Sequence, residues 1–238
     1  MNEALSAYGK ESLVSHLTKV VVNRLDEFNS IGVRELRAYV KGTLEGRDID
    51  ELRQLASQDY STVEAFKTKI RELVLAHRRR QFKEWLITEK TFLSTANGVG
   101  YHFPKSIPVI KEAVGVKRSL YLYEQAVNGF EDEVVRKIMD EDNVFFWHRN
   151  ERDREFCING FIHHYPDFII RLRSGKTLLV ETKGKQFKDT SEAKDRIELG
   201  RSWAEKAGSD FRYFMVFQQQ PMEGGISVEQ LLGYIRSL

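Results

Sequence analysis

Two apolar segments joined by Ser174-Gly175 limit the possible folds of this chain more than any other feature. Residues 157–172 and 177–184 are rich in branched and aromatic side chains, and a turn sequence separates them, so the stretch predicts a β-hairpin. Side chains alternate between the two faces of a strand, and paired residues share a face. The length of the turn therefore decides which side chains meet.

The turn length also decides whether Asp167 and Glu181 share a face. A tight two-residue turn at Ser174-Gly175 would place Asp167 opposite Thr182, whose side chain points away from that of Glu181. A three-residue loop, 173–175, places Asp167 directly opposite Glu181, with the glycine in the left-handed conformation of a bulged turn. We predict the three-residue loop, because it also collects the even-numbered apolar side chains of both segments on one face.

Two carboxylates and one ammonium group converge in this register. Lys183 lies two residues after Glu181 and projects to the same side as Glu181 and Asp167. Carboxylates bind hard divalent cations such as Mg²⁺, with Mn²⁺ as a substitute, and an ammonium group neutralises charge on a phosphate. Glu181 follows an apolar run in which an unpaired carboxylate is costly, so we expect a cation beside it. The pattern favours metal-dependent cleavage of phosphodiesters, with Asp167, Glu181 and Lys183 as catalytic residues.

The first ninety residues predict only helices. Apolar side chains recur at helical spacing over 13–28. Asp48 with Glu51, and Ser61 with Glu64, have the spacing of a capping box at a helix start. Each pair precedes an apolar-periodic segment, so we expect a helix to begin at each.

Helical periodicity is lost over 91–110, where glycine and proline collect, and this segment reads as a linker. We therefore expect a helical region with its linker over 1–110 and a second domain over 111–238. The second domain predicts helix, three strands, helix, strand, helix: a helix near 124–141, strands near 144–148, 157–172 and 177–184, a helix near 190–207, a strand near 211–218, and a last helix opened by Ser227 with Gln230.

This order, with Pro166-Asp167 on the second strand and Glu181-Thr182-Lys183 on the third, resembles the PD-(D/E)XK nuclease superfamily. The longer string, from Phe130-Glu131 through Trp147 and Asn150 to YPDFIIRL and LVETKGK, resembles the C-terminal endonuclease domain of type III restriction enzyme Res subunits and related helicase-nucleases. The resemblance covers about residues 121–238. It implies an α/β (α+β) fold with a restriction-endonuclease-like αβββαβ core, in which helices flank a mixed central sheet. It also implies a magnesium-dependent endodeoxyribonuclease whose products carry 5′-phosphate ends.

The resemblance adds metal ligands to the candidate site. Asp167, Glu181 and the backbone carbonyl of Thr182 would ligate the metal ion. Glu131 lies within the apolar stripe of its helix, and relatives use a glutamate of this helix to bind the metal or orient its water. The alternative for Glu131 is a side chain that snorkels or caps a neighbouring loop.

Several residues are candidates for contacts with DNA. By parity His163, and not His164, lies on the face of Asp167, where it would contact a phosphate; both histidines also fit a purely structural role. Three consecutive arginines on a helix spread over about 200 degrees, so they fit a solvated face as well as a DNA contact. The candidates are Lys185, Gln186 and Lys188 after the third strand, His163 before the second, and Arg78, Arg79 and Arg80 in the helical region.

Composition excludes some classes of protein and leaves others open. With one cysteine, Cys157, the chain has neither an internal disulfide nor a cysteine-rich zinc site. We find no apolar run of membrane length and no leader at the N-terminus, so we expect a cytoplasmic protein without membrane contact.

No Gly-rich phosphate loop occurs in the sequence, so this chain is not itself an ATP-driven motor. We expect DNA as the substrate and a helicase motor in the same longer polypeptide or in trans. A DNA-methyltransferase (modification) subunit is a further expected partner. The alternative function is a catalytically inactive DNA-binding or docking module of a helicase.

Overall fold

The computed structural model describes residues 7–88, 101–108, 117–124, 127–185 and 190–238. The chain divides into two compact units, Met1–Arg80 and Gln81–Leu238. The last turns of the long helix and the segment expected as a linker thus belong to the second unit, although 89–100 and 109–110 lie outside the described residues. In the described part of the chain, no helix is both long and apolar enough to cross a membrane.

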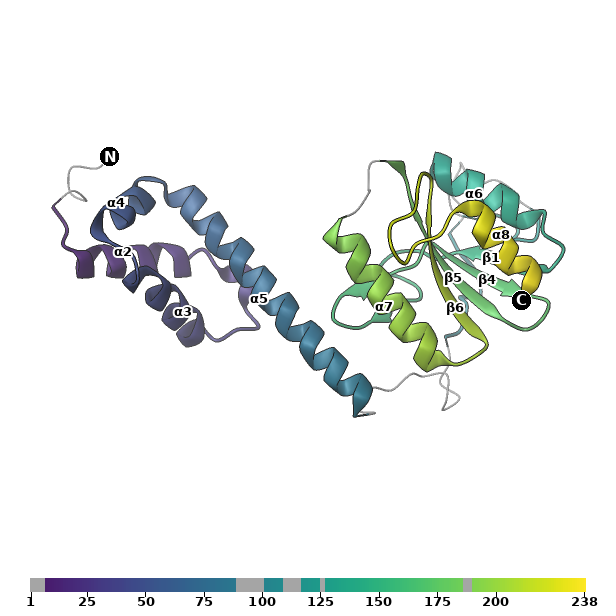
Figure 1. Ribbon diagram of the computed structural model, residues 1–238, viewed down its shortest axis with the longest axis horizontal. Coiled ribbons are helices and arrows are strands. Elements are labelled where there is room, and N and C mark those ends of the chain that lie inside the picture. The colour runs from purple at the N-terminus through teal and green to yellow at the C-terminus, as the bar shows by residue number, and fades with distance from the viewer. Residues whose placement is uncertain (1–6, 89–100, 109–116, 125–126, 186–189) are drawn as a thin grey trace. The chain divides into compact units, whose positions relative to one another are not determined.

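The first unit is helical, as its apolar periodicity predicts (Figure 1). Its core is formed by side chains at helical spacing that are almost wholly buried, among them Leu13, Leu17, Val21, Val40 and Leu44. Its elements are α2 (Lys10–Val22), a short 3-10 helix (Asp26–Phe28), α3 (Val33–Glu45), α4 (Ile49–Ser57) and α5 (Asp59–Ile87), the last of which continues into the second unit.

One of the two capping boxes predicted in the first unit is present. The Glu51 N–H donates to Asp48 Oδ1 at 2.8 Å, and α4 begins there. The prediction for Ser61 is wrong, because α5 begins two residues earlier, at Asp59. Ser61 lies in the first turn of that helix, where its hydroxyl donates to the carbonyl of Gln58 at 3.1 Å.

The second unit is a mixed sheet between helices (Figure 1). The strand order is β1-β4-β5-β6, with the first two pairings antiparallel and β5-β6 parallel. Helices α6 and α8 share one core with the even-numbered side chains of β4 and β5, while α7 packs on β6. The elements are α6 (Gly129–Met139), β1 (Val144–Arg149), β2 (Ile158–Asn159), β3 (His163–His164), β4 (Phe168–Leu172), β5 (Thr177–Lys183), α7 (Ser191–Ala207), β6 (Phe211–Phe217) and α8 (Val228–Ser237). The predicted mixed α and β architecture is confirmed.

The predicted register of the central hairpin is confirmed. Phe168 pairs with Val180, and the ladder ends in a three-residue loop at which the Leu172 N–H donates to the Lys176 carbonyl at 2.8 Å. Gly175 adopts the left-handed conformation, with φ of 87°. One step beyond Phe168 and Val180, this register sets Asp167 opposite Glu181.

The segment 157–172, which the sequence predicts as one strand, is broken into three. Ile158–Asn159 and His163–His164 pair with each other in a small separate sheet, and β4 begins only at Phe168. Pro166 has no N–H to donate to a ladder, which favours a break before β4. The side-chain amide of Asn150 fixes this break by donating to the carbonyls of Phe156 and Pro166 at 2.8 and 2.9 Å.

Candidate active site

Asp167 lies at the start of β4, where its side chain takes the place of a backbone acceptor. The N–H and the hydroxyl of Thr182 both donate to Asp167 Oδ2, each at 2.7 Å. The backbone of Asp167 is fixed as well, since its carbonyl accepts from the Asn150 N–H at 2.9 Å. These contacts hold one carboxylate oxygen against β5 and leave Oδ1 on the side of Arg149, whose Nη1 is 3.9 Å away.

Glu181 is a buried carboxylate on β5, only 2% exposed. Its Oε1 accepts from Lys183 Nζ at 2.7 Å and from Arg196 of α7 at 2.5 Å. Its Oε2 is buried and has no hydrogen-bond partner within the described part of the chain. An unsatisfied buried carboxylate oxygen is costly, and this atom has the chemistry of a donor to a cation.

The two carboxylates interact unfavourably. Burial, and then the charge of Glu181, raise the pKa of Asp167 to about 6, although the hydrogen bonds from Thr182 and the charge of Arg149 oppose this shift. Two acids that resist simultaneous ionisation are stabilised by a cation that both can bind. The chemistry of the pair therefore fits a hard divalent ion.

Glu131 is buried, as its place in the apolar stripe predicts, at 6% exposure. Its carboxylate completes a capping box, in which Glu131 Oε2 accepts from the Asn128 N–H at 3.0 Å, and the same oxygen lies 3.0 Å from Arg149 Nη1. Burial raises the pKa of Glu131, and the charge of Arg149 opposes that shift. In the described ranges no group of three His, Cys, Asp or Glu side chains is placed to hold a metal ion, and Glu131 is paired with Arg149.

A polar cavity of about 440 Å³ opens at Asp167. It is lined by three arginines and by one of the two predicted histidines: Arg149, Asn150, Glu151, Arg152, His163, Tyr165, Asp167 and Arg196. His164 lies elsewhere, 1% exposed, with its Nε2 2.9 Å from the hydroxyl of Tyr213. Burial, and then the charges of Arg196 and Lys183, lower the pKa of His164 to about 3, so His164 is neutral. His163, and not His164, thus lies on the side of Asp167, as the alternation of strand side chains predicts.

The other DNA-contact candidates follow β5 or belong to the first unit. Lys185 is exposed just after β5. Gln186 and Lys188 lie outside the described residues. Arg78, Arg79 and Arg80 belong to the first unit, where the first and third are exposed and Arg79 is half-buried.

Two arginines of the site are not found by sequence reasoning. Arg149 is the last residue of β1 and links Glu131 to Asp167, while Arg196 reaches Glu181 from α7. The sequence does carry a weak signal for Arg196, since Glu192 lies four residues earlier and pairs with it. That signal does not identify the buried partner, Glu181, because the packing of a helix on a sheet brings together residues far apart in the chain.

A buried cluster of three ionisable side chains, His148, Glu124 and Glu155, contacts the backbone of residues that line the cavity. His148 is fully buried, with Nδ1 3.1 Å from Glu124 Oε2 and Nε2 2.7 Å from Glu155 Oε2. Burial opposes protonation, but the hydrogen bond to Glu124 and the charges of Glu124 and Glu155 raise the pKa of His148. The same carboxylates accept from the backbone N–H groups of Arg149 and Glu151, at 3.2 and 2.8 Å, so the cluster holds the chain that lines the cavity.

No protein-family model, curated protein or solved structure matches this chain.

Proposed function

We propose that the second unit, Gln81–Leu238, is a divalent-metal-dependent endodeoxyribonuclease with a PD-(D/E)XK type of core. The observation that carries the proposal is the hairpin register, which sets Asp167 opposite Glu181. Lys183 lies on the same face, 2.7 Å from the buried Glu181 carboxylate. The order α6, β1, β4, β5, α7, β6 supports it, because that order is the one that the resemblance implies.

The residues present fit Mg²⁺ or Mn²⁺. Asp167 and Glu181 supply oxygen donors, and Glu181 Oε2 has no partner in the described part of the chain. An ion held by these two carboxylates, with the Thr182 carbonyl as a further proposed ligand, would lower the pKa of a bound water and offset charge on the scissile phosphate.

The chain's own cations have a separate part in the proposed reaction. Lys183 is a compact point charge that neutralises the developing charge on a non-bridging phosphate oxygen or orients the attacking water. Arg149 and Arg196 line the cavity beside Asp167 and hold the phosphate in place through charge-assisted hydrogen bonds. The proposed products carry 5′-phosphate ends.

We place the proposed activity in a type III restriction system. The substrate would be DNA, and an ATP-dependent helicase motor, in the same longer polypeptide or in trans, would be a partner. A modification subunit that reads the DNA sequence would be another. His163 and Lys185, both exposed, are the proposed contacts with the DNA backbone.

Incubation with plasmid DNA tests the proposal. Wild type in Mg²⁺ should convert supercoiled plasmid to nicked and linear forms, and EDTA should abolish this. Lys183→Ala and Asp167→Ala should each lower the rate by about a hundredfold or more, since each removes charge that acts on the transition state. Lys206→Ala, an exposed lysine at the end of α7, is the matched control and should cut normally.

The outcomes separate the candidate functions. Cutting that persists in both variants, or that needs no metal, would contradict the proposal. Wild type that binds DNA without cutting it, in the presence of its motor and modification partners, would support the inactive DNA-binding module.

A further inference from the structure

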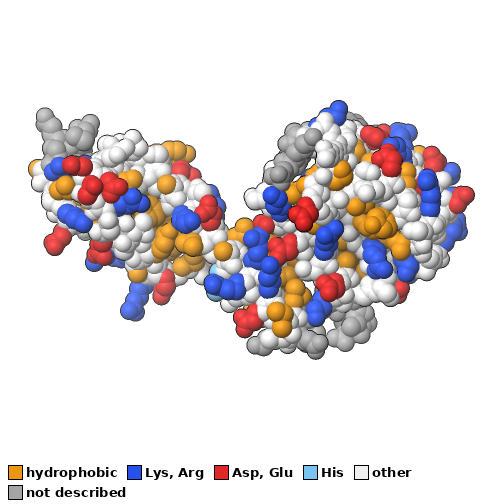
Figure 2. Space-filling view, viewed as in Figure 1, with side chains coloured by type: hydrophobic (Ala, Val, Ile, Leu, Met, Phe, Trp, Pro, Cys, Tyr) orange, Lys and Arg blue, Asp and Glu red, His pale blue; other side chains and the backbone are white. Residues whose placement is uncertain are grey.

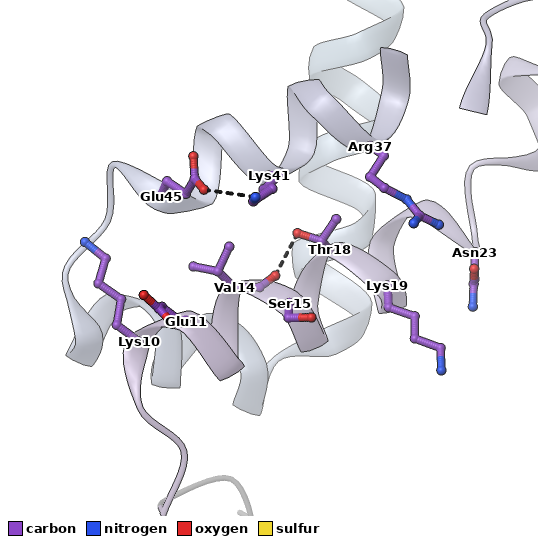
Figure 3. A pocket seen from close by; sticks show the side chains of 10 residues that line it. All are labelled: Lys10, Glu11, Val14, Ser15, Thr18, Lys19, Asn23, Arg37, Lys41 and Glu45. Atoms are coloured by element: carbon purple, nitrogen blue, oxygen red, sulfur yellow. Dashed lines mark hydrogen bonds and ion pairs between the residues drawn. The ribbon is translucent and has the colours of Figure 1, made fainter. Parts of the chain in front are cut away.

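The first unit has a polar groove between α2 and α3 that the proposed nuclease site does not use. Its volume is about 840 Å³. Ten residues line it: Lys10, Glu11, Val14, Ser15, Thr18, Lys19, Asn23, Arg37, Lys41 and Glu45. We call it the α2–α3 groove. At one end Lys19 and Asn23 face Arg37, and Lys10 and Glu11 lie at the other end (Figure 3).

Three of the four cations that line the groove have no carboxylate partner within the described residues. Lys10, Lys19 and Arg37 are exposed and form no ion pair within the described residues, and only Lys41 pairs with a carboxylate, Glu45, at 3.5 Å. Some cations elsewhere in the unit are paired: Arg47 with Glu51 at 3.2 Å, Arg53 with Asp50 at 3.2 Å and Lys69 with Glu72 at 2.9 Å. Arg24 and Arg34 are exposed and, like the groove cations, form no ion pair within the described residues.

Basic and acidic side chains are interspersed over the visible face of the first unit (Figure 2). Overall charge therefore does not mark a binding surface on this unit. A set of cations gathered along one groove does, because no paired carboxylate offsets the attraction of three of them for an external anion.

We infer that the α2–α3 groove binds the phosphodiester backbone of a nucleic acid. Lys10 and Lys19 are nine residues apart on one helix, which is about 13 Å along its axis. Adjacent phosphates of one duplex strand are spaced by about 3.4 Å along the helix axis, so the groove spans several of them. Ser15 and Asn23 add a hydroxyl and an amide, donors that commonly contact phosphate.

The lining argues against an acidic peptide as the occupant. Val14 is the one apolar residue among the ten, and it is 4% exposed, so the groove has no pocket for an apolar anchor. Apolar anchors supply much of the affinity in many peptide interfaces, whereas backbone binding needs only cations and polar donors. The poly-glutamate competitor in the test separates an acidic peptide from a nucleic acid. The contacts would be independent of base sequence.

The inference does not rest on the proposed catalysis, and its test contains no metal. Binding of the full chain to a fluorescein-labelled 30-nucleotide DNA strand and to a 30-base-pair duplex would be measured in EDTA by anisotropy, as a function of salt. The test variant is Lys10→Ala, Lys19→Ala and Arg37→Ala combined. The control is Arg47→Ala, Arg53→Ala and Lys69→Ala combined, which removes the same charge from ion-paired positions of the same unit.

We expect the groove variant to bind at least one of the two DNA forms about tenfold or more weakly at low salt. Its plot of log affinity against log salt should be shallower by about two to three units, as the loss of three phosphate contacts requires. The control should change affinity by less than about threefold, and circular dichroism should show both variants folded.

Several results would overturn the inference. These are equal weakening in both variants, no change in the groove variant, no binding of either DNA by wild type, or competition by poly-glutamate as effective as that by unlabelled DNA. Loss of binding in the groove variant, together with no plasmid cleavage by wild type in Mg²⁺ with its motor and modification partners present, would support the groove while contradicting the nuclease proposal, so the two can fail separately.

Discussion

At the scale of single residues, the site places two acids close together at the start of β4 and on β5. Glu181 is buried and Asp167 is about one-fifth exposed, and Asp167 accepts two hydrogen bonds from Thr182. The hydrogen bonds favour the charged form of Asp167, yet burial and Glu181 outweigh them. A raised carboxyl pKa of this kind makes folding less favourable at neutral pH when no ligand is bound, and it is typical of a ligand site.

The raised pKa of Asp167 predicts how stability depends on pH without divalent ions. A carboxyl group whose pKa rises from 3.8 in the unfolded chain to about 6 in the folded protein binds more protons when folded. Stability from this group is therefore present below pH 4 and is lost as pH rises to 6, by up to about 3 kcal/mol. Asp167→Asn, whose amide oxygen can still accept from Thr182, should be more stable than wild type at pH 7 in EDTA.

Urea denaturation at pH 4.5 and pH 7, with EDTA and with Mg²⁺, checks this prediction. Mg²⁺ should stabilise wild type at pH 7 and leave Asp167→Asn almost unchanged, since an ion that binds only the folded form shifts the equilibrium. If the stability of both proteins depended on pH in the same way, folding would not raise the pKa of Asp167.

At the scale of elements, the central hairpin depends on one glycine. Gly175 has φ of 87°, a conformation that residues with a Cβ rarely adopt. Gly175→Ala should lower the free energy of unfolding by about 1–2 kcal/mol. Gly129→Ala is the control, because Gly129 opens α6 with nothing within 4 Å of an added Cβ, and it should be neutral or slightly stabilising. Chemical denaturation measures both, and equal effects would argue against the bulged loop.

The buried cluster behind the cavity gives a second prediction at this scale. His148 has a raised pKa, so its contribution to stability is fully present below pH 6.5 and is lost as pH rises through the folded value. His148→Phe removes the shared partner of Glu124 and Glu155, which are 2% and 6% exposed, and should cost about 3 kcal/mol or more. Stability measured from pH 6 to 9 should fall with rising pH in wild type and should lose this slope in the variant. An unchanged slope would place the titration elsewhere.

Element order and hairpin register were predictable because both depend on local patterns. The parity of Asp167 and Glu181, together with the glycine in the loop, is enough to choose between two turns. The break before β4 was not predictable, because it depends on Asn150 from another segment. The contacts of Arg149 and Arg196 were missed for the same reason, since they follow from how α6 and α7 lie against the sheet.

At the scale of the whole molecule, the two units have separate hydrophobic cores. The helical core of the first unit contains Leu17, and the sheet core of the second contains Leu178, both fully buried. Stability here comes mainly from burial within each core, so damage to one core should not weaken the other. Each unit should therefore unfold in its own transition.

The distribution of tryptophan makes this testable in the full chain. All three tryptophans, Trp85, Trp147 and Trp203, belong to the second unit, so their fluorescence reports that unit, whereas helical circular dichroism reports both. Leu17→Ala should cost about 2–5 kcal/mol and shift part of the dichroism transition without moving the fluorescence midpoint in urea. Leu178→Ala should move the fluorescence midpoint by a similar free energy. If Leu17→Ala moved both probes together, the units would form one cooperative structure, and the long helix α5, which belongs to both, would be the element that couples them.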